Sequence, residues 1–202
     1  KTFYESCDAL LGISKQTVNI NKLVLGDKAE GKLIEYVPHG VDTEIFRPLG
    51  VEKVDKAYVD FEARMKQDKD INFTVLFNSR NIRRKQIPDT ILAFKHFVDT
   101  LPKEDKKKAM LLLHTPQVDG NGTDLNAIVE LLTPPEQDYN VHFTGGQFSP
   151  EEMNYLYNIA DATILLSSNE GWGLALTESL LSGTPFIANV TGGMQDQMRF
   201  TD

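Results

Sequence analysis

The sequence predicts an α/β protein whose core is a doubly wound parallel sheet, a Rossmann-like arrangement. Between residues 71 and 190, short apolar runs of strand length alternate with amphipathic helical segments at intervals of about 30 residues. Polar or glycine-bearing loops follow these runs, as expected where a parallel sheet binds ligands beyond the carboxyl ends of its strands. The length of 202 residues, with 41% hydrophobic and 25% charged residues, suffices for one sizeable core and part of a second.

Residues 1–47 do not have the pattern of a complete domain. They predict a strand, a helix and a second strand: residues 9–13, 14–26 and 33–37. The tripeptide Pro38-His39-Gly40 then indicates a tight turn, and we favour a turn over any ligand role for the isolated His39. Residues 49–70 are rich in charge and indicate a surface helix at the boundary to the regular part of the chain.

The regular part of the chain begins near residue 71. Four apolar runs are expected as its strands: residues 73–77, 109–113, 141–144 and 162–166. Three amphipathic segments are expected as its helices: residues 88–98, residues 125–132 and a segment that begins at Pro150. Ser149 before Pro150, with acidic residues in the first turn, is typical of a helix N-terminus.

Residues 162–196 form the most informative stretch of the sequence. It is expected to form a strand, a polar loop, a helix over residues 173–182, a turn and a strand over residues 184–190. Gly183 lies where a glycine that ends a helix is expected, and Pro185 prevents the helix from continuing. The helix offers four leucines to a core: Leu174, Leu176, Leu180 and Leu181. Beyond the last strand, the loop Thr191-Gly192-Gly193 is expected to border a bound ligand at the same edge of the sheet.

Two carboxylates flank the start of this helix. Glu170 lies in the loop before it, and Glu178 lies about 8 Å along the helix axis from Gly173. The helix N-terminus between them offers free N–H groups and a partial positive charge to a phosphate. Ionised carboxylates accept hydrogen bonds from sugar hydroxyls and repel phosphate. The pattern therefore predicts a nucleotide-sugar site, with the diphosphate at the helix end, the sugar near one carboxylate and the ribose near the other. Four residues that lead into the helix are donor-binding candidates: Gly171, Trp172, Gly173 and Leu174.

A basic loop follows the first strand of the regular part. It carries four cations within six residues of an acidic protein: Arg80, Arg83, Arg84 and Lys85. Such cations balance a diphosphate that two carboxylates would otherwise repel, although a run of charge is also the usual composition of a solvated loop. We favour phosphate contact for Arg80 and Lys85, and solvent-facing positions for Arg83 and Arg84.

Glu170, Glu178, Gly183 and Pro185 stand in the pattern E-x7-E followed by G-x-P, inside the strand–loop–helix frame described above. This pattern resembles the signature of retaining glycosyltransferases of family 4, which have the GT-B fold. The resemblance implies that Glu170 contacts the transferred sugar of the donor and that Glu178 contacts its ribose. The spacing alone arises often by chance, whereas the same spacing within this frame is much more specific.

The resemblance also covers the beginning of the chain. The strand that ends at Ser14, the sequence around Pro38 and the F-x-P of residues 46–48 are similar to the exit of the family's N-terminal domain. They imply that residues 1–47 are the end of the N-terminal acceptor domain with the interdomain linker. Residues 48–202 would then be the C-terminal donor-binding domain, truncated at its own C-terminus.

Other loops of the regular part match the family less closely. The family's G-R-x4-K-G frame maps onto Arg80 and Lys85 without its flanking glycines. Gly145 and Gly146 resemble the segment that borders the nucleotide base, and a strand followed by two glycines is equally an ordinary turn. Trp172 either edges the sugar site or covers the helix that follows it.

The composition argues against several other functions. A net charge of −8 disfavours nucleic-acid binding, and no apolar run approaches the length that spans a membrane. Cys7 is the only cysteine, which excludes an internal disulfide and a cysteine metal cluster. Neither the dinucleotide fingerprint G-x-G-x-x-G nor a P-loop is present. Because the chain opens with Lys1 and shows no secretory signal, we expect a cytoplasmic fragment.

The sequence thus indicates a fragment of a glycosyltransferase that moves a sugar from a nucleotide-diphosphate-sugar to an acceptor hydroxyl with retention. Glu170, Arg80 and Lys85 are its candidate catalytic residues, and no metal or cofactor is expected. The acceptor is a sugar, glycan, lipid or other hydroxyl compound, and the full-length protein leaves room for peripheral membrane contact. Because Glu170, Arg80 and Gly145 all follow strands, we expect them to meet at one edge of the sheet. The alternatives are a nucleotide-sugar epimerase of the same architecture and a non-catalytic module that binds nucleotide-sugars.

Overall fold

The structure, a computed structural model, describes residues 2–50, 55–134 and 137–199 of the chain. It divides into two compact units that each combine distant parts of the sequence. The first unit is formed by Lys1–Val41, Asn169–Thr177 and Val190–Asp202, and the second by Asp42–Ser168 and Glu178–Asn189. The division at residue 47 that the sequence predicts concerns the domains of the whole protein, and it stays a prediction.

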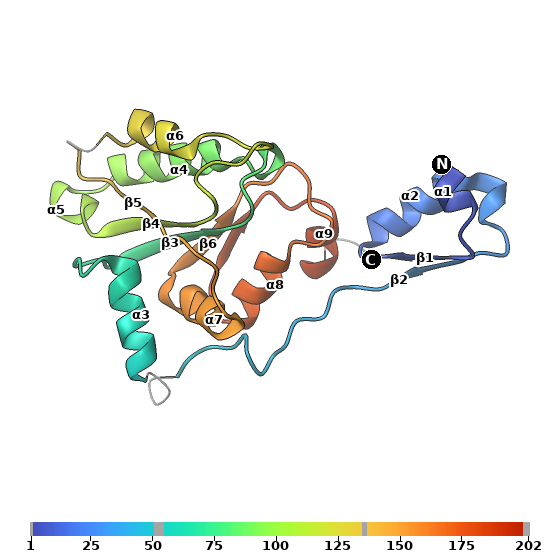
Figure 1. Ribbon diagram of the computed structural model, residues 1–202, viewed down its shortest axis with the longest axis horizontal. Coiled ribbons are helices and arrows are strands. Elements are labelled where there is room, and N and C mark those ends of the chain that lie inside the picture. Colours follow the sequence, from blue (N-terminus) through green and yellow to red (C-terminus); the bar gives the residue numbers. More distant parts are fainter. Residues whose placement is uncertain (1, 51–54, 135–136, 200–202) are drawn as a thin grey trace. The chain divides into compact units, whose positions relative to one another are not determined.

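The second unit contains a five-stranded parallel sheet in the order β5-β4-β3-β6-β7 (Figure 1). Its strands are β3 (Phe73–Asn78), β4 (Ala109–His114), β5 (Asn140–Phe143), β6 (Ala162–Leu165) and β7 (Phe186–Ala188). The chain proceeds outward from β3 to β5 and then returns to the other side of β3 to form β6 and β7. This reversal defines a doubly wound sheet, so the predicted fold class is confirmed.

Burial explains why the strands of this sheet are continuous apolar runs. A parallel sheet is covered on both faces, so that its central strands alternate little between apolar and polar residues. Every residue of β4 except its last is buried, and all four residues of β6 are buried. Between them, Leu76 and Phe77 of β3 are completely enclosed, and the core of the unit therefore lies along the three central strands.

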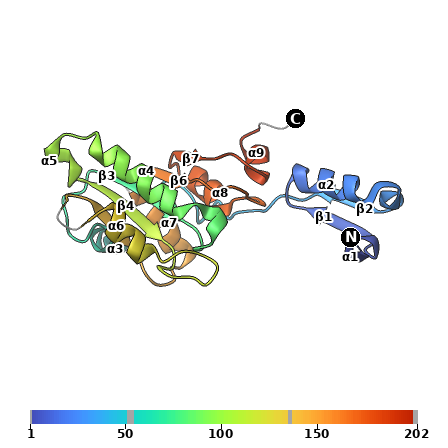
Figure 2. The same ribbon diagram turned by 90° about the horizontal axis from the view of Figure 1, so that it is seen from above.

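Helices cover both faces of the sheet. The second unit contains α3 (Lys56–Lys66), the 3-10 turn η3 (Arg83–Lys85), α4 (Ile87–Asp99), α5 (Lys103–Lys106), α6 (Leu125–Leu132) and α7 (Pro150–Ile159). Helices α4 and α6 pack together on one face, and α3 and α7 pack together on the other (Figure 1). Figure 2 shows α4 crossing over the strands. The predicted cap of α7 is confirmed, because Ser149 and Glu152 form a reciprocal capping box.

Helix α8 (Leu174–Leu181) follows the loop that carries Glu170, close to the predicted bounds. Its last residue is Leu181, and Gly183 just beyond it has a φ of +81°, the left-handed conformation expected after a helix. The prediction that its leucines serve a core is wrong for two of them, since Leu174 and Leu180 are 44% and 47% exposed. The buried face runs instead through Leu176, Ser179 and Ser182, because residues three apart share one side of a helix.

The first unit is small and has its own core. It comprises α1 (Thr2–Glu5), β1 (Ala9–Gly12), α2 (Lys15–Leu25), the 3-10 turn η1 (Gly26–Ala29), β2 (Leu33–Tyr36) and α9 (Gly193–Gln197). Strands β1 and β2 pair in parallel, and α2 packs on them through a cluster of four apolar side chains: Leu10, Val18, Leu25 and Ile34. The Ser14 hydroxyl caps α2 by accepting a hydrogen bond from the N–H of Thr17 at 3.1 Å.

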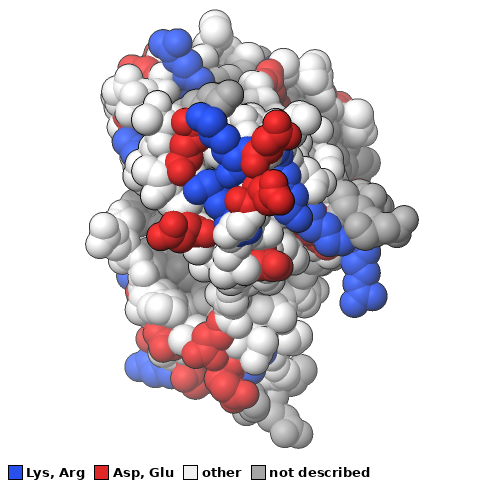
Figure 3. Space-filling model, turned by 90° about the vertical axis from the view of Figure 1, so that its right-hand side faces the viewer, with Lys and Arg blue, Asp and Glu red and all other residues white. Residues whose placement is uncertain are grey.

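Several elements differ from the predicted ones. The last strand, β7, is shorter than the predicted residues 184–190, and α9 is a helix where a loop was expected. Within the predicted helix of residues 49–70, the structure shows α3, while residues 51–54 lie outside the described part of the chain. Among the described residues, no helix is long and apolar enough to cross a membrane. On the face shown in Figure 3, basic and acidic side chains are interspersed rather than gathered in one basic patch.

Candidate functional site

A cavity of about 650 Å³ opens at the carboxyl edge of the sheet in the second unit. It lies where β3, β4 and β5 end, and residues that follow each of these strands line it. This is the place where parallel sheets bind ligands, because the loops that leave neighbouring strands converge there. The lining residues are the last residue of each strand and the loop that follows it: residues 78–80 for β3, residues 114–117 for β4 and residues 143–147 for β5.

The cavity brings together three of the residues that the sequence singled out. Arg80, Gly145 and Gly146 all line it. The two glycines have φ values of +65° and +66°, and a Cβ on either would meet nothing within 4 Å. Glycine is therefore required at these positions by the backbone conformation and not by lack of space. The expected position of Glu170 beside Arg80 stays a prediction, since Glu170 belongs to the first unit.

The four cations of the basic loop lie in different environments. Arg83 and Arg84 are exposed, as the sequence predicts. Lys85 lies in η3, is buried and does not line the cavity. Of the four cations, Arg80 lines the cavity, and the phosphate contact expected for Lys85 stays a prediction.

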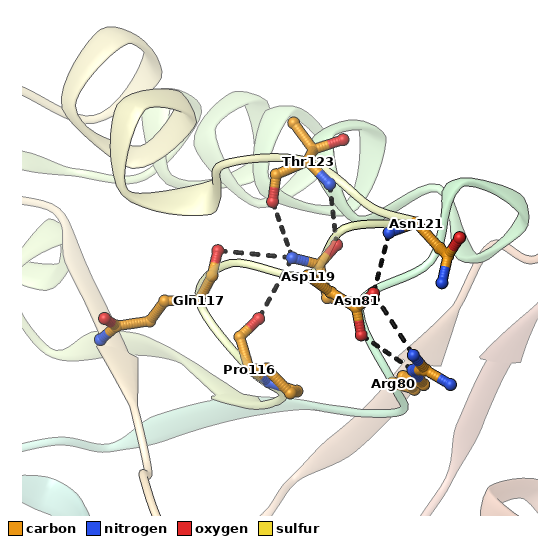
Figure 4. A network of polar contacts seen from close by, with 7 residues as sticks. All are labelled: Arg80, Asn81, Pro116, Gln117, Asp119, Asn121 and Thr123. Atoms are coloured by element: carbon orange, nitrogen blue, oxygen red, sulfur yellow. Dashed lines mark hydrogen bonds and ion pairs between the residues drawn. The ribbon is translucent and has the colours of Figure 1, made fainter.

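Arg80 forms an ion pair with Asp119 in the loop after β4 (Figure 4). Its Nε donates to Oδ2 of Asp119 at 2.8 Å, and its Nη2 donates to Oδ1 at 3.4 Å. The hydrogen bond raises the pKa of Arg80 and lowers the pKa of Asp119. The guanidinium is held in a two-point fork while 63% of the side chain stays exposed, and Nη1 has no hydrogen-bond partner among the described residues.

The loops after β3 and β4 are joined by the buried side chain of Asn81 (Figure 4). Its Nδ2 donates to the carbonyl oxygens of Pro116, Gln117 and Thr123 at 3.2, 3.3 and 2.7 Å, and its Oδ1 accepts from the N–H of Thr123 at 3.2 Å. A Cβ on Gly122 would collide with both the backbone and the side chain of Asn81. The two loops are therefore interlocked, and the contact positions Arg80 next to Asp119.

Glu178 belongs to the second unit and is linked to the cavity through two hydrogen bonds. Its Oε2 accepts from the hydroxyl of Tyr157 at 2.7 Å, and that hydroxyl accepts from Nδ2 of Asn78, also at 2.7 Å. Burial raises the pKa of Glu178, whereas the hydrogen bond from Tyr157 lowers it. Asn78 is the last residue of β3 and lines the cavity. A single residue, Tyr157, therefore separates Glu178 from this part of the cavity wall.

The first unit holds the other predicted site residues. Glu170 and Trp172 are buried there, whereas Gly171 and Leu174 are exposed. Trp172 donates from Nε1 to Oγ1 of Thr177 at 3.1 Å, one turn into its own helix. This hydrogen bond ties the indole to the first turns of α8, and a place for Trp172 at the edge of the sugar site stays a prediction.

The loop that carries Glu170 packs backbone to backbone against the start of α9. A Cβ on Gly192 would collide with the carbonyl oxygen of Glu170, and a Cβ on Gly193 would collide with that of Gly171. The N–H of Gly193 donates to the same two carbonyl oxygens, at 3.3 and 3.2 Å. Met194 packs against Gly173 of the same loop. The glycines expected to border a ligand thus fix the backbone beside Glu170.

Comparison with known proteins supports this architecture. The family model described as "Glycosyl transferases group 1" matches residues 60–200, which is more than half of the chain. The chain belongs to the group 1 glycosyltransferases. The predicted resemblance to glycosyltransferases is thereby confirmed. As a separate observation, no group of three or more His, Cys, Asp and Glu residues in the described part of the chain could hold a metal ion.

The chain is similar in sequence to glycosyltransferases with different names. It is 38% identical over 116 residues to an alpha-monoglucosyldiacylglycerol synthase of Streptococcus pneumoniae, a match that covers 57% of this chain and 24% of that protein. It is 25% identical over 200 residues to an N-acetyl-alpha-D-glucosaminyl L-malate synthase of Bacillus anthracis, covering 98% of this chain and 45% of that protein. The chain thus spans less than half the length of these two relatives.

Solved glycosyltransferases share its fold. Sucrose-phosphate synthase from Thermosynechococcus elongatus superposes with a TM-score of 0.69 and 23% identity, over 96% of this chain and 44% of that chain. The Anabaena protein HepE, solved in complex with UDP and glucose, superposes with a TM-score of 0.66 and 16% identity, over 97% of this chain and 47% of that chain. At these identities the likeness shows the fold, and the neighbours are GT-B glycosyltransferases.

Proposed function

We propose that this chain carries the donor-binding part of a glycosyltransferase that uses a nucleotide-diphosphate-sugar. The observation that carries the proposal is the cavity at the carboxyl edge of β3, β4 and β5, lined by Arg80 and the Gly145–Gly146 turn and linked through Asn78 to Glu178. The cavity wall thus holds a cation and a tight glycine turn, and two hydrogen bonds connect it to a carboxylate. A diphosphate, a base and a ribose need these three kinds of group.

Each group has a proposed role in holding the donor. The guanidinium of Arg80 has five N–H donors, and those that Asp119 leaves free bind the diphosphate and stabilise it as it departs. The Gly145–Gly146 turn borders the nucleotide base, and Glu178 accepts hydrogen bonds from the ribose. Glu170 contacts the transferred sugar, and Lys85 supports the diphosphate from within the basic loop.

The proposed reaction transfers the sugar to an acceptor hydroxyl with retention at the anomeric carbon, without a metal or a cofactor. The family match and the E-x7-E spacing of Glu170 and Glu178 support this proposal. The relatives' names include a lipid product and a malate product, so the proposed acceptor is a hydroxyl compound of wider chemistry than sugars alone.

A panel of nucleotide-diphosphate-sugars tests the proposal on the full-length protein. A ligand at one hundred times its dissociation constant stabilises the folded state by about 2.7 kcal/mol, which thermal unfolding detects. We expect stabilisation by at least one nucleotide-sugar and, with acceptor present, a new glycoside of retained configuration. An isomerised donor would indicate an epimerase instead, and binding without any product over a range of acceptors would indicate a binding module.

Arg80 provides a sharper test of the cavity. Arg80→Ala is expected to weaken the binding of a nucleoside diphosphate by about tenfold, because a charge-assisted hydrogen bond to phosphate is lost. Binding of the corresponding nucleoside, which has no phosphate, should change far less. Calorimetry with both ligands measures the difference, and Arg83→Ala is the control because Arg83 is exposed in the same loop and does not line the cavity. Equal losses for the two ligands would show that Arg80 does not contact phosphate.

A further inference from the structure

Tyr157 is the largest completely buried side chain of the described protein, and it ends in a polar hydroxyl. Burying a hydroxyl is unfavourable unless it forms hydrogen bonds, so its two partners matter. They are Glu178 in α8 and Asn78 at the end of β3, each at 2.7 Å, while Tyr157 itself lies in α7. One side chain therefore links three separate elements of the second unit.

The direction of these hydrogen bonds follows from the chemistry of the groups. An ionised carboxylate only accepts, so the single proton of the Tyr157 hydroxyl points to Oε2 of Glu178. The hydroxyl oxygen must then accept from Asn78, which requires the amide nitrogen and not the amide oxygen of Asn78 to face it. The three residues form one directed chain of donors, from Asn78 through Tyr157 to Glu178.

Packing leaves Tyr157 a single position. Its ring meets the ring of Phe46 edge to face, with centroids 6.2 Å apart, and its carbonyl oxygen accepts from Oγ1 of Thr184 at 2.7 Å. A side chain enclosed in this way cannot follow a moving carboxylate. The rotamer of Glu178 is thus set by a fixed hydroxyl and not by solvent.

Only one carboxylate oxygen of Glu178, Oε2, accepts a hydrogen bond from Tyr157. Oε1 accepts no hydrogen bond from the part of the chain that the structure describes, and the side chain is half-buried. Among the described groups, the one titratable residue that acts on Glu178 is Tyr157 from α7, and the other neighbour, Asn78 from β3, does not ionise. Burial alone favours the neutral carboxyl, and the hydroxyl proton of Tyr157 opposes it.

We propose that Tyr157 is a positioning residue of the donor site, which keeps Glu178 ionised and in one rotamer so that Oε1 is presented to the donor. Asn78 strengthens the hydroxyl as a donor and connects the carboxylate to the cavity wall. This inference rests on the proposed function, because it assigns the presented oxygen to a hydroxyl of the nucleotide.

The first experiment needs no ligand. The side-chain carboxyl carbon of Glu178 is followed by NMR through a pH titration in the full-length wild type, in Tyr157→Phe and in Tyr155→Phe. Removing a donor to the ionised form favours the protonated form, so Glu178 should titrate at higher pH in Tyr157→Phe. Tyr155 is the matched control, since it lies in the same helix and its hydroxyl has no hydrogen bond to a described residue. An unchanged midpoint in Tyr157→Phe would overturn the inference.

A second variant guards against loss of the fold. If thermal unfolding shows that Tyr157→Phe is unfolded, Asn78→Ala replaces it in the titration. Loss of the Asn78 amide weakens the hydroxyl as a donor, so Glu178 should again titrate at higher pH, by a smaller shift. An unchanged midpoint there would likewise count against the directed chain.

The second experiment measures nucleotide binding by calorimetry at a series of pH values, with the diphosphates of uridine, adenosine and guanosine as probes. Near neutral pH, Tyr157→Phe should bind roughly tenfold more weakly than the wild type. The difference should be largest at pH values between the two midpoints that the titration gives for Glu178. At higher pH, where Glu178 is ionised in both proteins, it should shrink to the part that the lost rotamer constraint contributes. A purely structural defect would weaken binding equally at every pH, and that result would overturn the inference.

The two experiments separate this inference from the proposed function. If none of the diphosphates binds the wild type, the proposed function fails and the inference fails with it, although the titration still reports whether Tyr157 controls Glu178. If a diphosphate binds the wild type and Tyr157→Phe equally at every pH, the proposed function stands and the inference alone is overturned.

Discussion

Replacing Glu178 with alanine is expected to weaken the bare nucleoside diphosphate and the complete nucleotide-sugar by the same factor. Glu178 is proposed to bind the ribose, which both ligands contain. Loss of a hydrogen bond to a charged group corresponds to about 1.5–3 kcal/mol. Glu170→Ala should instead spare the bare nucleotide and lower turnover in the full-length enzyme, because Glu170 is proposed to contact the transferred sugar.

Calorimetry with both ligands, together with turnover of the complete donor, measures these effects. Glu178→Gln and Glu170→Gln are the matched controls, and they should do less harm to binding because the amide oxygen still accepts a hydrogen bond. Thermal unfolding must accompany Glu178→Ala, since that variant leaves the buried hydroxyl of Tyr157 without its acceptor. The assignment of separate roles would be wrong if Glu170→Ala lost the bare nucleotide as severely as Glu178→Ala.

Gly192→Ala is expected to reduce turnover by about a hundredfold, the scale of effect that follows a displacement of about 1 Å at a catalytic group. Gly192 has a φ of +56°, and a Cβ there would collide with the carbonyl oxygen of Glu170. Since the obstacle is backbone and not a flexible side chain, the loop that carries Glu170 must move. Affinity for the bare nucleoside diphosphate should change much less than turnover.

Gly31→Ala is the control for this substitution. Gly31 also has a positive φ, +76°, but a Cβ there would meet nothing within 4 Å. It therefore reproduces the backbone strain of an alanine in the left-handed region without the collision. If both variants lowered turnover equally, the loss would come from strain or instability and not from displacement of Glu170.

The fold was predictable because its signals are local. Strands such as β4 are unbroken apolar runs, and caps such as Ser149 before Pro150 can be recognised within a few residues of sequence. The exposed Leu174 and Leu180 show the limit of this reasoning, since a leucine in a helix does not reveal which face the sheet will cover. That choice depends on packing between elements.

The site was predictable only in part, for a related reason. The position of Arg80 and Gly145 at the cavity could be predicted because loops that follow parallel strands share one edge of the sheet. Asp119 and Tyr157 were missed, because their importance lies in partners far along the chain, Arg80 and Glu178. A tyrosine in an amphipathic helix has the pattern of an ordinary core residue. The position of Asn78 at the cavity, by contrast, could have been predicted, since this residue ends the first strand of the regular part.

The buried amide of Asn81 has a consequence for the thermodynamics of binding. Because it ties the loop after β3 to the loop after β4, both loops are already ordered before any ligand arrives. Flexible loops lose conformational freedom on association, whereas preorganised loops have little left to lose. Binding of the proposed donor at this edge should therefore cost the protein little conformational entropy. In a variant that lacks the hydrogen bonds of Asn81, the two loops would have to become ordered on binding, and this entropic cost should be larger.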